Sequence, residues 1–139
     1  MAPTIQEGDH IVADTTYYIS RRPKDSEIIL FKRGPTIFIK RVVASGGEVV
    51  EGKNGEVFVN GRMLKEPYIE HSGSPEGWMN NFGPAKIRAD EYFVIGDNRD
   101  FSLDSRSSDY GMVSFDSIAG KPLFVLFGKQ SGRAGKAIR

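Results

Sequence analysis

The sequence contains no cysteine, and this absence excludes thiol catalysis and disulfide bonds. It has no apolar run approaching the roughly 20 residues of a membrane-spanning helix, and its start lacks the basic, apolar and small-residue zones of a secretory signal. Neither sign of charge dominates, because 19 basic and 18 acidic side chains are interspersed along the 139 residues. Such a balance offers nucleic acid no basic surface. We therefore expect the chain as given to be soluble and not to bind DNA or RNA.

A chain of 139 residues with 39% hydrophobic content is long enough to bury one core, which favours a single domain. Short apolar or alternating runs separated by Gly, Pro and Asn dominate it, a pattern typical of strands. The expected strands cover residues 10–14, 27–32, 36–44, 47–51, 56–60, 91–95 and 122–127. Asn54-Gly55 and Asn60-Gly61 are turn signals on either side of one run and predict consecutive hairpins. The sequence thus predicts a mainly β fold.

Other parts of the chain lack a regular period. Residues 70–86 combine Gly and Pro breaks with aromatic side chains, and we interpret them as a long loop. Short helical turns are expected only near residues 105–108 and 114–118, where Ser114 stands in a capping position. The tail, residues 128–139, has three glycines, four cationic side chains and little to bury, so we expect it to be basic and flexible.

The expected strand over residues 36–44 carries a lysine among apolar neighbours. Because side chains alternate along a strand, Phe38, Lys40 and Val42 share one face and Arg41 lies on the other. Burial disfavours the charged form of lysine and lowers its pKa by up to about 3–5 units, which makes the amine a base near neutral pH. From this strand alone, however, a simpler interpretation is favoured, in which the two cations protect an edge strand against aggregation.

Carboxylates, hydroxyls and guanidinium groups are unusually dense in residues 96–106. A solvated polar turn is the simplest interpretation, and composition alone favours it. A calcium site is a second, because Asp100, Ser102 and Asp104 alternate as in an EF-hand loop. The later Gly and Glu of that motif are missing, and the two arginines of the segment would repel the ion. The third is a scaffold in which Asp–Arg pairs fix the backbone and a hydroxyl points at a lysine amine.

Three segments together are more informative than any of them alone. They are Met1-Ala2-Pro3-Thr4 followed by Gly8-Asp9, then Ile39-Lys40-Arg41-Val42-Val43, and Gly96-Asp97-Asn98-Arg99-Asp100 through Ser102, Asp104, Ser105 and Arg106. With these segments the chain resembles the bacterial type I signal peptidases over about residues 1–127. The pattern of the third segment is long and rarely met elsewhere, and residues 96–106 match it at each fixed position. The resemblance implies a domain of coiled antiparallel β-sheets with an inserted hairpin excursion over about residues 52–89.

The resemblance also implies a Ser–Lys dyad, in which a lysine amine takes the proton of a serine nucleophile. Lys40 matches the general base, and Ser102 matches the group that orients its amine. Supporting contacts are expected within two pairs, namely Arg41 with Asp97 and Asp104 with Arg106. In this family the nucleophilic serine directly precedes the residue that matches Met1, so it is absent from these 139 residues. The groups of the family's oxyanion hole are absent with it, and we do not expect hydrolysis by the chain as given.

Apolar residues near the lysine match positions that bind substrate in this family. They are Met1, Ile5, Ile37, Phe38 and Ile39. The resemblance implies that the strand leading to Lys40 takes the substrate as an added strand, with main-chain hydrogen bonds giving affinity and alternate side chains giving specificity. The alternative for these side chains is core packing, which is favoured for Ile5.

The activity implied is removal of signal peptides from exported preproteins after a small residue, at an Ala-x-Ala type of site. It requires no metal and no cofactor. Family members work at the outer face of the cytoplasmic membrane and carry an anchor upstream of the serine, so the chain as given is expected to lack anchor and nucleophile together. The main alternative is a non-catalytic protein on this scaffold that binds peptides or assists surface assembly. The self-cleaving repressors, which share the dyad, have no match to residues 96–106.

Overall fold

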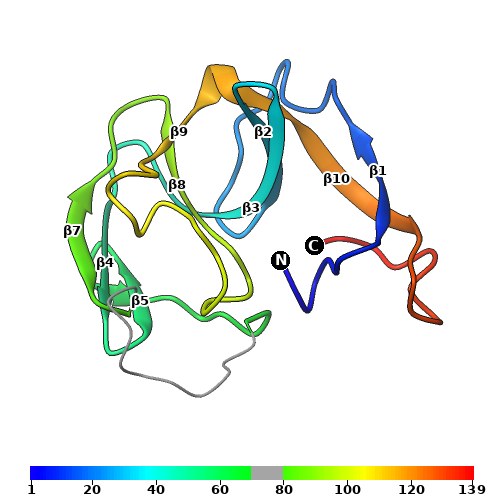
Figure 1. Cartoon of the computed structure of the whole chain (residues 1–139). Coiled ribbons are helices and arrows are strands. Elements are labelled where there is room, and N and C mark those ends of the chain that lie inside the picture. Colours follow the sequence, from blue (N-terminus) through cyan, green and yellow to red (C-terminus); the bar gives the residue numbers. More distant parts are fainter. Residues whose placement is uncertain (70–79) are drawn as a thin grey trace.

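The computed structural model describes residues 1–69 and 80–139, and its strands form two antiparallel sheets (Figure 1). The prediction of a mainly β fold is confirmed. The two ends of the chain lie close together, between β3 and the pair of β1 and β10 (Figure 1). Within the described residues, no helical segment has the length and apolar character needed to cross a bilayer.

The larger sheet has the strand order β1-β10-β2-β3-β8-β9. Its strands are β1 (His10–Asp14), β2 (Ile28–Arg33), β3 (Thr36–Ser45), β8 (Glu91–Ile95), β9 (Val113–Ser114) and β10 (Ile118–Phe127). Register shifts interrupt the pairing of β1 with β10 and of β3 with β8. Such irregularities bend strands and increase their twist, and the sheet is strongly curved (Figure 1). Because β8 pairs with β3 only from Arg41 onward, residues 36–40 have β2 on one edge and no described strand on the other.

The smaller sheet has the order β6-β5-β4-β7. Its strands are β4 (Val49–Lys53), β5 (Glu56–Val59), β6 (Arg62–Met63) and β7 (Phe82–Lys86). Asn54 and Asn60 adopt left-handed φ angles of 53° and 51°, and each is followed by a glycine that is also left-handed. Two successive left-handed residues form the tight turn that suits a hairpin. The predicted consecutive hairpins are therefore confirmed.

The strand β7 lies in the segment that the sequence predicts to be a long loop. That interpretation is wrong for residues 82–86, which pair with β4 through Val49↔Lys86 and Val50↔Ala85. Gly83-Pro84 interrupts the alternation by which a strand is recognised, yet an edge strand tolerates proline because one of its sides needs no hydrogen bond. The part of the predicted loop that covers residues 70–79 lies outside the described residues.

Two apolar clusters meet across the central strands. The first contains Tyr18, Ile29, Phe31, Val42, Tyr92, Val94, Tyr110 and Val113. The second, towards the smaller sheet, contains Val43, Ala44, Val50, Val57, Ile87, Phe93 and Ile95. Consecutive residues of β8 belong to opposite clusters, and β3 contributes Val42 to the first cluster and Val43 to the second, so both faces are buried here. Burial on both faces explains why residues 42–44 and 92–95 are continuous apolar runs, and it makes β3 and β8 the rigid support of the residues that follow.

The short helix η2 (Phe115–Ser117) forms in the stretch where a helical turn is expected, although the Ser114 side chain makes no capping hydrogen bond. Residues 105–108 form turns rather than a helix. Ser105 bonds to β8, since its amide donates to the Val94 carbonyl at 3.0 Å, while the Ser107 amide donates to the Asp104 carbonyl within a turn.

Two residues of the last segment, 128–139, are buried against the rest of the chain, Arg133 and Ile138, whereas the sequence predicts a flexible tail. Ile138 is 5% exposed, and its amide donates to the Leu123 carbonyl at 2.9 Å. The Arg133 guanidinium holds both carboxylate oxygens of Asp9, through Nε at 2.8 and 2.9 Å. Local composition does not reveal these anchors, because the Arg133 partner lies 124 positions earlier in the chain.

Candidate active site

Lys40 stands on β3 immediately before the pairing with β8 begins. Its Nζ donates a hydrogen bond of 2.7 Å to the Oγ of Ser102, which comes from the loop after β8. The Ser102 residue is 5% exposed. The structure thus brings together the two residues that the sequence predicts to act as base and orienting group.

The pKa of Lys40 is lowered from its ordinary value, first of all because burial disfavours the ammonium form. The Asp104 carboxylate opposes this effect, and the positive charge of Arg106 adds to it. More of the Lys40 amine is therefore neutral near neutral pH than in an exposed lysine. A neutral amine at hydrogen-bond distance from a hydroxyl is able to accept its proton.

Gly96 lets the Ser102 hydroxyl lie directly against the backbone at the end of β8. A Cβ added at this position would stand 2.2 Å from the Ser102 Oγ and 3.4 Å from the Lys40 Nζ. Real side chains do not approach this closely, so only glycine permits the Lys40–Ser102 contact in its present form.

The loop of residues 96–106 is held by its own charged groups. The Asp104 carboxylate accepts from the Arg106 Nε at 2.8 Å and from the Gly96 amide at 3.1 Å. Burial acts to raise the pKa of Asp104, but its bonds with Arg106, Ser102 and the Gly96 amide hold this pKa below the usual range. Of the three side chains considered as calcium ligands, Asp104 is bound by Arg106 and Ser102 is bound by Lys40. Both partners are cations, which disfavours a calcium ion at this position.

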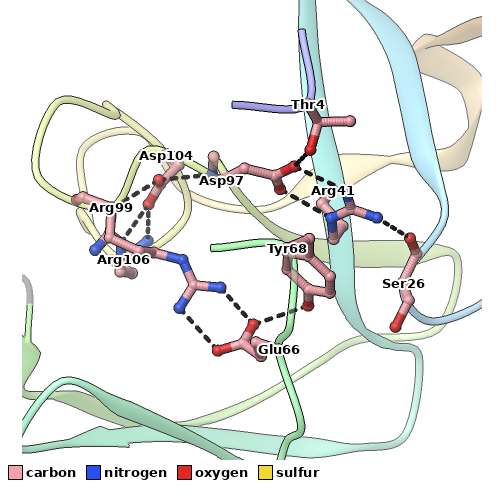
Figure 2. A network of polar contacts seen from close by, with 10 residues as sticks. Thr4, Ser26, Arg41, Glu66, Tyr68, Asp97, Arg99, Asp104 and Arg106 are labelled. Carbon is pink, nitrogen blue, oxygen red and sulfur yellow. Dashed lines mark hydrogen bonds and ion pairs between the residues drawn. The ribbon is translucent and has the colours of Figure 1, made fainter. Parts of the chain in front are cut away.

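Arg41 connects this loop to both ends of the chain. Its guanidinium donates to the two Asp97 oxygens at 2.8 and 2.7 Å, a bidentate pair in which both side chains are at most 2% exposed. Its remaining terminal nitrogen donates to the carbonyls of Ser26, at 2.6 Å, and of Arg139, at 3.0 Å. The Thr4 hydroxyl donates to the same Asp97 carboxylate at 2.5 Å (Figure 2).

The first residue of the described chain lies close to the lysine. The pKa of the Met1 amino group is lowered, mainly by burial and secondly by the positive charge of Lys40, while Asp97 acts in the opposite direction. The Met1 side chain packs against the same apolar cluster as Ile39, the residue before Lys40, which places both amines in one partly buried region.

Sequence reasoning does not single out Glu66 and Tyr68, which also reach this region. Glu66 forms a bidentate ion pair with Arg99, with the Arg99 Nη1 at 2.9 Å from one oxygen, and its other oxygen accepts from the Tyr68 hydroxyl at 2.9 Å (Figure 2). The Arg41 guanidinium lies over the Tyr68 ring, 3.8 Å from its centroid. No sequence signal marks these residues, because an isolated Glu-Pro-Tyr after a hairpin has no characteristic pattern and its partner is 33 residues away.

The five residues predicted to bind substrate do not form one group. Met1, Ile5 and Ile39 pack together against a cluster of buried apolar side chains on the β10 side of the sheet. Phe38 packs on the opposite side against the first apolar cluster. Ile37 is 57% exposed at the part of β3 whose outer edge has no described strand.

The chain is similar to known proteins over most of its length. A family model described as "Signal peptidase, peptidase S26" matches residues 1–127. Signal peptidase I P of Bacillus subtilis subsp. natto is 34% identical over 143 residues, which cover 98% of this chain and 76% of that protein. Probable signal peptidase I-2 of Synechocystis is 36% identical over 135 residues, covering 91% and 58%. The crystal structure of a signal peptidase I from Enterococcus faecalis superposes with a TM-score of 0.63 at 28% identity, covering 73% of this chain and 97% of that one.

Proposed function

The chain belongs to the signal peptidase family, peptidase S26, and on this premise we propose that it is the catalytic domain of a serine endopeptidase that removes signal peptides from exported preproteins. The observation that carries the proposal is the hydrogen bond of 2.7 Å between the half-buried Lys40 amine and Ser102. A partly desolvated lysine held by a hydroxyl is suited to take a proton from a second, nucleophilic hydroxyl.

Lys40 acts first as general base and then as general acid. It takes the proton of the serine as that oxygen attacks the carbonyl of the scissile bond, and it gives the proton to the departing amine. Water then releases the acyl group in a second step that uses the same amine. Ser102 keeps the amine aimed, because its hydroxyl accepts one of the amine protons.

The nucleophile of the proposal is a serine directly before Met1 in the complete protein. The packing of Met1 beside Ile39 supports this position, as does the lowered pKa of the Met1 amino group, caused mainly by burial and secondly by Lys40. The residue before Met1 is bonded to that nitrogen, so under this proposal its side chain lies in the same region as the Lys40 amine. The 139 residues alone are inactive under this proposal, because they hold the base without the nucleophile.

The substrate adds to the free edge of β3. Residues 36–40 pair with β2 on one side only among the described residues, which leaves backbone donors and acceptors for an extended peptide. Small residues of an Ala-x-Ala type are the expected substrate beside Lys40, next to the apolar side chains of Met1, Ile5 and Ile39. The reaction takes place at the outer face of the cytoplasmic membrane, with the complete protein anchored by a segment upstream of the serine.

The test is to express the chain extended by the genomic codons upstream of Met1 and to assay cleavage of a peptide with an Ala-x-Ala site in detergent. We expect cleavage after the second alanine, and its loss in Lys40→Ala. If the codon before Met1 does not encode serine and no cleavage occurs, the proposal fails. A non-catalytic peptide-binding or surface-assembly protein on this scaffold then becomes the better interpretation.

A further inference from the structure

A short segment after β6, residues 64–69, braces the loop of residues 96–106 from the side of the smaller sheet (Figure 2). Its Glu66 side chain is 3% exposed, and its carboxylate binds the Arg99 guanidinium through both oxygens. The Tyr68 hydroxyl donates to the same carboxylate. One acidic group therefore ties the loop to a different part of the chain.

The second contact of the brace is with Arg41. The guanidinium lies over the Tyr68 ring, 3.8 Å from its centre, a cation–π contact. Burial and the nearby Glu66 carboxylate raise the pKa of Tyr68 above its ordinary value, so its hydroxyl stays protonated and keeps donating to Glu66. The ring thus limits where the Arg41 guanidinium, and with it Asp97, comes to rest.

The brace closes a ring of contacts around the candidate base. From Glu66, the ring continues to Arg99, whose carbonyl accepts from the Arg106 Nη2 at 2.8 Å. Arg106 binds Asp104, which accepts from the Gly96 amide. The next residue, Asp97, binds Arg41, which returns the ring to Tyr68. Ser102, the partner of Lys40, lies inside the stretch that this ring holds at both ends.

We propose that Glu66 and Tyr68 are positioning residues, which hold the start of the loop 96–106 at Arg99 and, through Arg41, at Asp97, so that Ser102 aims the Lys40 amine. The inference rests on the proposed function for the role of Lys40, but the geometry that it concerns is present in the chain as given. A buried ion pair is weak support for stability, because desolvation offsets much of its attraction. The contribution of the Glu66–Arg99 pair is instead to restrict the loop to a single geometry.

The test measures the Lys40 amine directly in the 139-residue chain, by following its Cε resonance through a pH titration by NMR. The charges that act on this amine are Asp104, Arg106 and the Met1 amino group, and none of them is changed. In Glu66→Gln the ion pair with Arg99 is lost. We expect the titration midpoint of Lys40 to move upward, toward that of an exposed lysine, as the loosened loop admits water.

Tyr68→Phe is the milder variant, since it removes one hydroxyl and keeps the ring beneath Arg41. We expect a smaller upward shift of the Lys40 midpoint in this variant, and it keeps the test decisive if Glu66→Gln does not fold. The control is Glu27→Gln, which breaks a similar set of bonds, from Lys121 and from the Tyr18 hydroxyl, elsewhere in the sheet. We expect the control to lower the melting temperature and to leave the Lys40 midpoint unchanged.

An unchanged Lys40 midpoint in both brace variants, with a lowered melting temperature, would overturn the proposal and leave Glu66 and Tyr68 a structural role only. In the extended protein with its serine, we expect kcat to fall about ten- to a hundredfold with little change in KM, as for a misplaced catalytic group. If the extended protein does not cleave peptides at all, the proposed function fails, while the Lys40 titration still decides the role of the brace.

Discussion

Two groups of ion pairs in this protein differ sharply in their surroundings. In the loop pairs, every side chain is at most 5% exposed; they are Arg41–Asp97, Arg106–Asp104 and Arg99–Glu66. The surface pairs keep at least one side chain in water; they are Arg22–Asp90, Lys53–Glu51 and Arg88–Glu91. The two groups use the same chemistry, so the comparison separates what charge does from what burial does.

The difference shows that the loop charges specify geometry. A surface pair contributes only about 0–1 kcal/mol, because water screens it and its side chains lose freedom. A buried pair costs desolvation when it forms, and breaking it leaves a charge without compensation. Two of the loop arginines also donate to backbone carbonyls, Arg41 to Ser26 and Arg139, and Arg106 to Arg99. Few other arrangements of the backbone provide these acceptors together with the three carboxylates.

The largest effect is expected where one carboxylate of a loop pair is removed. Asp97→Asn keeps the shape of the side chain but leaves the Arg41 guanidinium buried without a counter-charge. We expect the free energy of unfolding to fall by about 3–5 kcal/mol, measured by urea unfolding. The matched control is Asp90→Asn on the surface, at a left-handed φ of 63° that asparagine tolerates. Its expected loss is at most about 1 kcal/mol, and equal losses in the two variants would contradict the comparison.

A smaller effect is expected from crowding the loop without touching its charges. In Gly96→Ala the added Cβ stands 2.2 Å from the Ser102 Oγ, so the hydroxyl must move away from Lys40. We expect a loss of stability of about 1–3 kcal/mol and loss of cleavage in the extended protein.

Gly52→Ala is the control for this crowding, because its Cβ meets the Phe82 ring in the smaller sheet at the same 2.2 Å. We expect a similar loss of stability with cleavage retained. Equal loss of cleavage in the two alanine variants would mean that activity follows stability rather than the position of Ser102.

Most of the fold can be predicted from alternation and turn residues. The strand expected over residues 91–95 is β8 (Glu91–Ile95), and the one over residues 27–32 is shifted by one position, to Ile28–Arg33. The strand β7 is missed because Gly83-Pro84 breaks its pattern. The packing of the tail is missed because Arg133 finds its partner at the other end of the chain, a distance over which local composition carries no information.

The candidate site likewise contains residues that the sequence predicts and residues that only the structure reveals. The density of polar and charged residues and the family resemblance single out Lys40, Ser102 and the aspartate-rich loop. The structure places Lys40 and Ser102 in hydrogen-bond contact. Their catalytic roles stay predictions. Glu66 and Tyr68 are found only in three dimensions. Their contribution depends on a hairpin that turns the chain back onto the loop, and no spacing in the sequence encodes that approach.

Lys40 differs from the loop arginines, because its hydrogen bond goes to a hydroxyl and not to a carboxylate. Burial lowers its pKa in the folded protein, whereas the unfolded chain keeps a value of about 10.4. Below the folded pKa both states hold the proton, and the folded state bears the full desolvation cost. As pH rises between the two values, the folded state releases its proton first, so the unfolded state binds more protons and stability increases with pH.

Lys40→Met is therefore expected to raise the free energy of unfolding, by less than Asp97→Asn lowers it. The variant removes a partly buried charge and leaves Ser102 its bond to Asp104. Relative to the native chain, we expect Lys40→Met to be most favourable below the folded pKa of Lys40 and to lose that advantage as pH rises toward the unfolded value of about 10.4. Urea unfolding of both chains at several pH values measures this difference. A difference that is constant with pH would mean that the Lys40 amine is hydrated, and a hydrated amine is too basic to serve as the general base near neutral pH.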